Sequence, residues 1–228
     1  MLASFGDMLR VPGPGGKSLK MAQAEGASVR VCYSPFEAVQ LAESHPDRKV
    51  VFLGVGFETT APAVAATVEM ARGKALSNFS IYSCHKLIPP ALEALVAQPG
   101  VRVDGFLLPG HVSSVIGVDP YGFLADKHGI PAVVAGFEPG DILQALLMLI
   151  RRINSGAPGV DNQYIRAVGQ QGNQRAQDVM RRVFEPSDAL WRGLGTISRS
   201  GLALREEYAA MDAERSFSLS RSGGEAPP

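Results

Sequence analysis

The stretch KVVFLGVGFETTAPAVAATVEMAR (49–72) sets the architecture of this chain. After Lys49, the next seven residues are apolar and rich in β-branched side chains, which predicts a buried strand over 49–56. Apolar residues then recur at helical spacing over 61–72, and FSIYSC (79–84) predicts a second strand. The order strand, helix, strand is typical of parallel strands that are joined by a crossover helix.

The same alternation extends in both directions from this stretch. Further strands are predicted over 29–34, 103–110 and 130–136, and further helices over 36–45, 89–97, 112–126 and 140–153. The strands are almost continuously apolar, as expected where helices cover both faces of a sheet. The sequence therefore predicts an α/β fold, with a parallel sheet, helices on both faces and Rossmann-like layering.

The alternation of predicted strands and helices divides the chain into four segments. A lead-in segment over 1–28 contains FGDMLRVPG (5–13) and precedes an α/β domain over 29–154. A helical and irregular region follows over 155–214, with helical spacing over 162–185 and an irregular or strand-like part over 190–204. The tail over 215–228 is polar, and we expect it to be disordered.

The composition excludes several classes of protein. Lys+Arg and Asp+Glu both total 22 among 228 residues, so the charge favours neither nucleic acid nor an anionic membrane as a partner. The densest apolar run, over 142–150, is much shorter than the roughly 20 residues of a membrane span. The first residues carry no secretory signal, and we therefore expect a cytoplasmic protein.

Polar side chains follow four of the predicted strands, at the point where each strand ends. They are Glu58, Thr59 and Thr60; Cys84, His85 and Lys86; His111 and Ser113; and Glu138. In open parallel sheets, ligands bind outside the carboxyl ends of the strands. We therefore expect these residues to line a crevice at one edge of one sheet.

The tripeptide Gly-Phe-Glu occurs at 56–58 and at 136–138, each time between a predicted strand and a predicted helix. The glycine permits a turn, and a helix N-terminus favours the carboxylate. Each glutamate either caps a helix or belongs to a functional crevice, and the neighbouring His85, His111 and Cys84 favour the crevice. Such ligands suit iron or zinc, although the sequence contains neither HxxxH nor CxxC spacing.

Cys84 is the candidate reactive thiol, because His85 and Lys86 beside it could favour the thiolate. The alternative is that Cys84 is a small buried side chain, as we expect of Cys32 inside its strand. GVGFETT fits neither a P-loop nor the GxGxxG of dinucleotide binders. The absence of GxSxG disfavours an α/β-hydrolase serine.

Seven segments, in order along the chain, resemble one family. They are FGDMLRVPG (5–13), YSPFEAV (33–39), VVFLGVGFETTAP (50–62), HKLIPPAL (85–92), LLPGHVSSVIG (107–117), PAVVAGFEPGDIL (131–143) and NQYIRAVGQQGN (162–173). Together they strongly resemble the HypD family of hydrogenase maturation factors, over about residues 2–217. The first segment adds Asp7 and Arg10 to the candidate ligand- or partner-binding residues.

The resemblance implies a scaffold rather than an enzyme, with a thiol redox role in the full family. HypD-type proteins pair with a HypC-type chaperone, and a HypE-type partner supplies cyanide. The scaffold assembles an iron centre with cyanide and carbon monoxide ligands for nickel–iron hydrogenase. Transient iron is therefore the implied metal, and a four-iron–four-sulfur cluster is the family's cofactor.

The sequence departs from the family pattern at both ends. Family members carry a Cys-Gly-x-His segment and a Gly-Pro-Gly-Cys-Pro-x-Cys segment ahead of FGDMLRVPG, and a cysteine-rich segment after the region matched here. Cys32 and Cys84 replace neither set, so the ligands of the family's cluster are absent from this sequence. We expect a central fragment or a truncated reading frame.

The sequence thus predicts a HypD-like assembly factor in which Cys84, His85 and His111 are the candidate catalytic residues. Glu58 and Glu138 would position helix ends or accept hydrogen bonds, and the histidines would orient an iron-bound ligand or move protons. Two alternatives stay open. One is a metal-assisted small-molecule hydrolase that uses the same crevice, and the other is a folded but inactive remnant.

Overall fold

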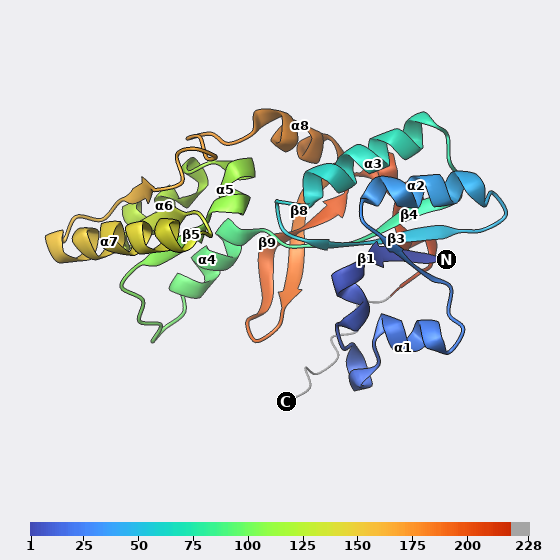
Figure 1. Ribbon diagram of the computed structural model, residues 1–228, viewed down its shortest axis with the longest axis horizontal. Helices are drawn as coiled ribbons and strands as arrows, with labels where there is room; N and C mark the ends of the chain where they lie inside the picture. Colours follow the sequence, from blue (N-terminus) through green and yellow to red (C-terminus); the bar gives the residue numbers. More distant parts are fainter. Residues whose placement is uncertain (220–228) are drawn as a thin grey trace. The chain divides into compact units, whose positions relative to one another are not determined.

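The strands form three separate sheets in the computed structural model, which describes residues 1–219. Their orders are β2-β1-β3-β4, β5-β6-β7 and β8-β9. The first two sheets are parallel throughout, and the third is an antiparallel hairpin. Helices connect the parallel strands, so the predicted α/β class is confirmed (Figure 1).

The chain forms two compact units, which we describe separately. Unit 1 consists of Met1–Gly56, Thr60–Lys86 and the chain from Val179 on, and unit 2 consists of Phe57–Thr59 and Leu87–Asp178. The stretch over 29–154, predicted as one α/β domain, contributes to both units. Helix α8 (Gln174–Val183) contains the last boundary between them.

Unit 1 contains the four-stranded sheet and the hairpin. Its elements are β1 (Leu2–Phe5), η1 (Gly6–Arg10), η2 (Pro14–Gly16), α1 (Leu19–Ala24), β2 (Val29–Cys32), α2 (Pro35–Ser44), β3 (Val50–Gly56), α3 (Ala61–Gly73), β4 (Phe79–His85), β8 (Phe184–Trp191), β9 (Gly195–Leu204), η4 (Glu206–Met211) and α9 (Ala213–Ser216). In Figure 1, α2 and α3 lie over one face of this sheet, and η1 and α1 lie on the other side.

The core of unit 1 is built from the strands at the centre of its sheet. Phe52, Phe79 and Ile81 have at most 1% of their surface exposed, and the Phe5 ring packs edge-on against Phe52 at 5.3 Å. Helix α3 buries small and β-branched side chains, including Val64 and Val68. Burying large apolar side chains supplies roughly 1.5–3 kcal/mol each and so stabilises the sheet.

The turn after β3 requires glycine. Gly56 has φ +140°, and a Cβ there would lie 2.2 Å from the Thr60 hydroxyl oxygen. The left-handed backbone and the close approach both exclude a side chain. The Gly-Phe-Glu turn that the sequence predicts at 56–58 therefore has a steric cause.

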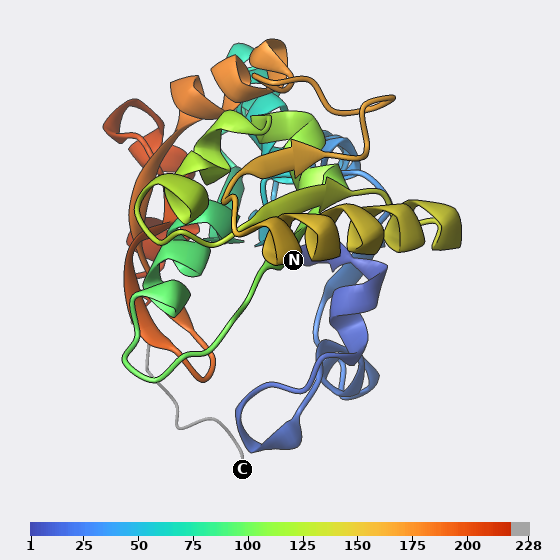
Figure 2. The same cartoon turned by 90° about the vertical axis from the view of Figure 1, so that its left-hand side faces the viewer.

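Unit 2 contains the three-stranded sheet. Its elements are α4 (Ile88–Val96), β5 (Phe106–Pro109), α5 (Gly110–Ile116), η3 (Asp119–Tyr121), α6 (Gly122–Asp126), β6 (Ala132–Ala135), α7 (Pro139–Ser155) and β7 (Val160–Asn162). Leu108, Tyr121, Leu124 and Val134 form one buried cluster, and Val133, Ala145 and Leu149 belong to a second, between β6 and α7. Figure 2 shows α7 beside the strands of this sheet.

The expectation of a single sheet edge is wrong. The strands that precede Glu58 and His85 are β3 and β4 of the first sheet, whereas those that precede His111 and Glu138 are β5 and β6 of the second. Strand β5 pairs with β6 and not with β4. Apolar runs identify strands but not their partners, so the sequence could not show that a new sheet begins at β5.

Two further segments differ from the prediction, and a third agrees with it. The lead-in segment contains β1, which lies between β2 and β3 in the first sheet. This strand was not predicted, because Ala3 and Ser4 interrupt its apolar pattern and it contains no β-branched residue. Helical spacing was predicted over 162–185. Within that range only Gln174–Val183 is α-helical, while residue 162 belongs to β7 and residues 184 and 185 belong to β8. For 190–204 the sequence left two alternatives, irregular or strand-like. The segment is strand-like and belongs to β8 and β9.

The tail predicted over 215–228 lies mostly outside the described residues, which end at 219. Residues 215 and 216 belong to α9. Among residues 1–219, the search for a helix long and apolar enough to cross a membrane finds none.

Candidate functional site

The candidate residues divide between the two units. Asp7, Arg10, Thr60, Cys84, His85 and Lys86 belong to unit 1, and Glu58, Thr59, His111, Ser113 and Glu138 belong to unit 2. Each group is therefore described within its own unit.

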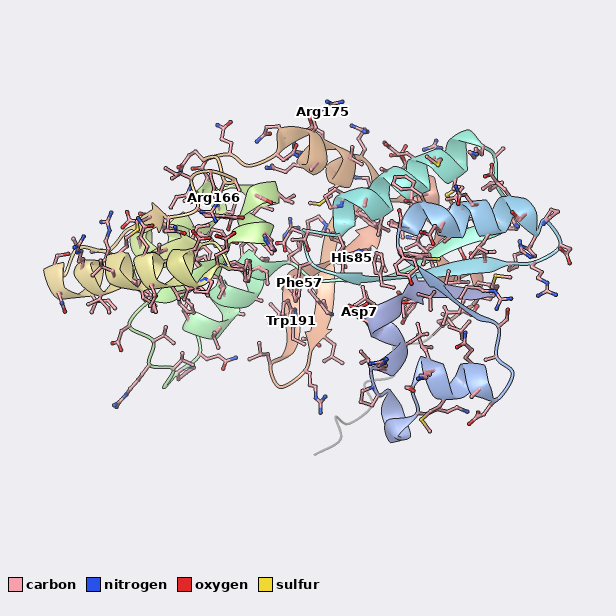
Figure 3. The ribbon with its side chains drawn as sticks, in the orientation of Figure 1. Asp7, Phe57, His85, Arg166, Arg175 and Trp191 are labelled. Carbon is pink, nitrogen blue, oxygen red and sulfur yellow. The ribbon has the colours of Figure 1, made fainter. Side chains whose placement is uncertain are left out.

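His85 ends β4 and is 1% exposed (Figure 3). The parallel register places His85 opposite Gly56 and Ser83 opposite Gly54. A Cβ on Gly54 would lie 2.8 Å from Cε1 of His85, so the imidazole packs directly over a glycine of the neighbouring strand. Phe184 of β8 contributes a ring 5.7 Å away, and the imidazole is therefore enclosed by apolar groups.

Hydrogen bonds fix the tautomer of this ring. The Ser83 hydroxyl donates to the Leu202 carbonyl at 2.7 Å, because a carbonyl oxygen can only accept. The hydroxyl has one proton, so at its 3.2 Å contact with Nδ1 of His85 the ring nitrogen must donate. Nε2 then carries the lone pair, and it is buried without a hydrogen-bond partner within the described chain.

Burial also fixes the charge of His85. Because the charged form is poorly solvated there, the pKa falls from 6.5 to about 4. The residue is therefore neutral at physiological pH. An uncharged imidazole whose Nε2 has no hydrogen-bond partner within the described chain keeps a lone pair on that nitrogen. This lone pair can accept a hydrogen bond or ligate a metal ion, as the sequence-based hypothesis requires.

Cys84 is partly exposed, whereas Cys32 is 1% exposed. Successive side chains in a strand point to opposite faces, so Cys84 and His85 do not converge on one point. The Lys86 ammonium donates to the Leu190 carbonyl at 2.8 Å and lies 5.9 Å from the Trp191 ring. A neutral His85 removes one of the two charges expected to favour a Cys84 thiolate, and the Lys86 ammonium, which stays charged, is directed toward the hairpin.

The remaining candidates in unit 1 lie apart from His85 in the sequence and make local contacts. Asp7 Oδ1 accepts a hydrogen bond from the Met8 N–H at 3.0 Å, and Arg10 is an exposed residue at the end of η1. The Thr60 hydroxyl lies 3.5 Å from the Val55 carbonyl and supports the turn after β3. None of these contacts points to a ligand.

In unit 2, Glu58 is a buried carboxyl with 1% of its surface exposed. Its Oε1 accepts a hydrogen bond from the Ile88 N–H at 2.9 Å, and its buried Oε2 has no partner among the described residues. Glu58 therefore contacts the first residue of α4, and not the helix α3 that follows it in the sequence. The predicted contact with a helix N-terminus exists, but with a different helix.

Burial raises the pKa of Glu58 from 4.5 to about 7, although the N–H groups of Glu58 and Ile88 lower it in part. Near neutral pH, both the protonated and the ionised form of Glu58 are therefore populated, so the group can donate or accept a proton. Burial raises the pKa of Tyr121, and the charge of Glu58 adds to this effect; the Tyr121 hydroxyl lies 3.4 Å from the Ser113 hydroxyl.

Ser113 is fully buried and donates to the Pro109 carbonyl at 2.9 Å, which satisfies the hydroxyl within α5. Thr59 is exposed. The exposed His111 ring packs against Phe137 at 4.4 Å between centroids, and Phe137 is 57% exposed. The pair brings the residues after β5 and β6 together at the surface of unit 2.

Sequence reasoning missed a polar network in unit 2. The Arg166 guanidinium makes two hydrogen bonds to the Asp141 carboxylate, at 2.7 and 2.5 Å, and Gln163 donates to it at 2.9 Å. These contacts lower the pKa of Asp141 to about 2. Gln163 also accepts from the Gly136 N–H at 3.2 Å, so the network holds the second Gly-Phe-Glu turn.

Glu138 adds an exposed carboxylate to this network. It is the N-cap residue of α7, its side chain is 81% exposed, and its carboxylate lies 3.6 Å from Arg166 (Figure 3). The polar residues in NQYIRAVG (162–169) and the two acidic residues in GFEPGD (136–141) were the available signals. Neither pattern shows that the two segments meet.

No group of three His, Cys, Asp or Glu side chains that could hold a metal ion occurs within residues 1–219. His85 offers one ligand atom, Nε2, and Cys84 points to the other face of the sheet. The donors within residues 1–219 therefore do not form a complete metal site by themselves.

Comparison with known proteins now identifies the family. Residues 1–228 match the family described as "HypD: Hydrogenase formation hypA family". The chain belongs to the HypD family, which confirms the resemblance found in the seven motifs.

Individual relatives agree with this assignment. The hydrogenase maturation factor HypD of Azotobacter vinelandii is 50% identical over 230 residues, which cover 98% of this chain and 61% of the relative. The hydrogenase expression/formation protein HupD of Azotobacter chroococcum is 48% identical over 225 residues, 96% of this chain and 59% of the relative. A putative hydrogenase expression/formation protein of Methanocaldococcus jannaschii is 45% identical over 212 residues, which cover 93% of this chain and 59% of the relative. The chain thus spans about three-fifths of the length of these curated relatives.

The first prediction concerns the pH dependence that His85 gives to stability. The unfolded chain binds a proton below pH 6.5, but the folded chain binds it only near pH 4, so stability falls as the pH drops through this window. We expect His85→Gln to remove a loss of roughly 3 kcal/mol between pH 6.5 and 4. Urea unfolding at several pH values measures it, with His111→Gln at an exposed position as the control. An unchanged slope in His85→Gln would contradict the assignment.

The second prediction concerns Glu58, whose effect has the opposite sign. The folded chain holds the proton up to about pH 7 and the unfolded chain only to 4.5, so stability falls as the pH rises through this window. Glu58→Gln keeps an oxygen for the Ile88 N–H and carries no charge. We expect it to gain stability relative to the natural chain by roughly 3 kcal/mol between pH 4.5 and 8. Unfolding curves at both pH values decide this, with Glu138→Gln as the control, and a gain that is independent of pH would refute it.

The third prediction concerns the two thiols. Cys84 should react with iodoacetamide faster than Cys32 in the native protein, because Cys84 is partly exposed. Burial and the nearby Glu37 both raise the pKa of Cys32, which disfavours its thiolate. Mass spectrometry of timed alkylation compares the two rates. Equal rates, or a faster Cys32, would remove Cys84 from the candidate residues.

Proposed function

We propose that this chain is a hydrogenase maturation factor that serves as a scaffold for assembling the iron centre of nickel–iron hydrogenase. The observation that carries this proposal is the match of the whole chain to the HypD family. Relatives named as hydrogenase maturation or formation proteins, at 44–50% identity over almost the whole chain, support it. The comparisons give no support to the hydrolase alternative.

We assign the cargo as iron with two cyanide ligands and one carbon monoxide, handled together with a HypC-type chaperone and a HypE-type cyanide donor. The donor atoms in this chain favour a shared site. His85 offers a neutral Nε2, and no second ligand from the described part of the chain converges on it. A scaffold that supplies one ligand and receives the others from a partner is consistent with such a donor set.

His85 has the properties of a residue that orients an iron-bound ligand. Its ring is held by Gly54, Ser83 and Phe184, so Nε2 has a fixed position. It stays uncharged down to about pH 4 and can therefore accept a hydrogen bond throughout the physiological range. Glu58, with a pKa of about 7, could donate or accept a proton within unit 2.

The family's iron–sulfur cluster needs more thiolates than Cys32 and Cys84 provide. We therefore do not assign redox chemistry by such a cluster to this chain. Both thiols would stay reduced in the cytoplasm, which is where we place the assembly.

A binding experiment tests the proposal. The chain and the HypC-type chaperone of the same organism are coexpressed anaerobically with iron, and a tag on the chain recovers the complex. We expect the chaperone to copurify and His85→Gln to lower the iron retained per complex at least threefold while the chaperone stays bound. His45→Gln, which also replaces a histidine of unit 1, should leave both quantities unchanged.

Two outcomes would contradict the proposal. Failure of the folded chain to bind the chaperone at micromolar concentrations would refute the scaffold role. Unchanged iron in His85→Gln would refute the role of His85 while leaving the scaffold role intact.

A further inference from the structure

A groove lies between strand β2 and helix α2 of unit 1. It has a volume of about 390 Å³, and its walls are residues 30–32 of β2 and the side of α2 that runs from Glu37 through Leu41 to His45. These helix positions are four residues apart and therefore lie one above another on a single side of α2. The groove follows that side for roughly 12 Å, which is the length of about four residues of an extended chain.

The first sheet has a free edge at this groove. Strand β2 ends the order β2-β1-β3-β4, and among residues 1–219 no further strand or bridge pairs with its other side. The Leu2 N–H donates to the Ser28 carbonyl at 2.8 Å, so in the parallel register the even-numbered residues of β2 direct their backbone groups toward β1. Val29 and Val31 direct theirs to the free edge.

Most of this edge is blocked, and one residue of it is open. Gln23 of α1 donates its side-chain amide to the Val29 carbonyl at 2.9 Å, and the Glu37 carboxylate accepts from the Tyr33 N–H at 3.2 Å. Proteins commonly protect sheet edges, because unpaired backbone groups invite another strand. Between these two contacts, Val31 is 39% exposed and presents one N–H and one carbonyl beside the groove. An added strand can therefore pair with this edge at one position.

A single open residue favours an antiparallel partner strand. In an antiparallel ladder, two opposite residues exchange both of their hydrogen bonds, whereas in a parallel ladder the two bonds go to different residues. An antiparallel peptide therefore needs only its central residue, opposite Val31, to use both groups of the open position. The residues before and after the central one then lie opposite Cys32 and Arg30.

The two ends of the groove carry opposite charges. A helix that follows a parallel strand runs back along the sheet, so Glu37 lies beside the end of β2 and Arg30 lies at its start. Because Arg30 and Cys32 alternate with Val31, their side chains point to the side of the sheet that faces α2. Arg30 is exposed, Glu37 is half-buried, and neither forms an ion pair with another described residue. Both charges are therefore available to a ligand.

From these observations we propose that the groove is a peptide-binding site, in which an extended segment of another protein adds to the free edge of β2. The segment runs antiparallel to β2 and carries a basic residue, any residue and an acidic residue, in that order. Its basic side chain pairs with Glu37 and its acidic side chain with Arg30, at positions roughly 7 Å apart along the strand. Strand addition of this kind takes affinity from the backbone and specificity from alternate side chains. The groove contains none of the candidate residues of the proposed function.

Peptides of opposite charge order test the specificity. The probe is Thr-Val-Lys-Val-Glu-Val-Thr, labelled with fluorescein at its N-terminus and amidated at its C-terminus, and fluorescence anisotropy measures its binding to the whole chain. We expect a dissociation constant of roughly 0.1 mM. The charge-reversed peptide Thr-Val-Glu-Val-Lys-Val-Thr should bind at least tenfold more weakly.

Variants of the chain locate the peptide. Arg30→Glu/Glu37→Lys exchanges the two charges of the groove, so it should bind the charge-reversed peptide at least tenfold more tightly than the original probe. Arg102→Glu makes the same charge change at an exposed position of unit 2 and should keep the original preference. Circular dichroism verifies that both variants are folded.

Methylation of the peptide backbone tests strand addition. A methyl group on the nitrogen of the central valine removes the N–H that pairs with the Val31 carbonyl, and it should weaken binding at least tenfold. In an antiparallel pair the N–H of the neighbouring lysine points away from β2. Methylation of that nitrogen should therefore weaken binding less than threefold.

Four results would overturn the proposal. They are no binding of the probe up to about 1 mM, equal binding of both charge orders to the natural chain, a preference that Arg30→Glu/Glu37→Lys does not reverse, and equal weakening by the two methyl groups. Chaperone binding and iron retention are measured separately, so none of these results would bear on the proposed function.

Discussion

The parallel pairing of β3 with β4 is the constraint on which unit 1 depends. Seven residue pairs run in register from Val50 and Phe79 to Gly56 and His85, and the Lys86 N–H extends the ladder to the Gly56 carbonyl at 2.9 Å. Both strands therefore end at the same level. This register also puts Gly54 under the imidazole of His85, which could not be buried there beside a larger residue.

Burial displaces the pKa of His85 in unit 1 and of Glu58 in unit 2. His85 in unit 1 becomes a weak base, and Glu58 in unit 2 becomes a weak acid, in both cases because the charged form is poorly solvated. The two effects on stability have opposite signs between about pH 4.5 and 6.5 and offset one another there. Groups of this kind cost stability and are often retained for function, and both follow strands of the first sheet.

The sequence was sufficient for the fold class because apolar runs and helical spacing alternate regularly from residue 29 to residue 153. The same signal could not show that β5 starts a second sheet, since periodicity identifies a strand and says nothing of its partner. It also missed β1, because Ala3 and Ser4 interrupt the apolar pattern of this strand. At the site, the positions of His85 and Glu58 at strand ends were readable, but the burial that sets their charge was not. Asp141 and Arg166 meet only through tertiary structure.

The central claim is that His85 is a buried, uncharged imidazole whose Nε2 carries a lone pair with no hydrogen-bond partner among the described residues. Nuclear magnetic resonance of the chain labelled with ¹⁵N-histidine measures this most directly, through the shifts of both ring nitrogens of His85 as the pH is lowered. The account predicts the Nδ1–H tautomer at pH 7 and no protonation until near pH 4. An Nε2–H tautomer, or a titration midpoint near 6.5, would contradict it.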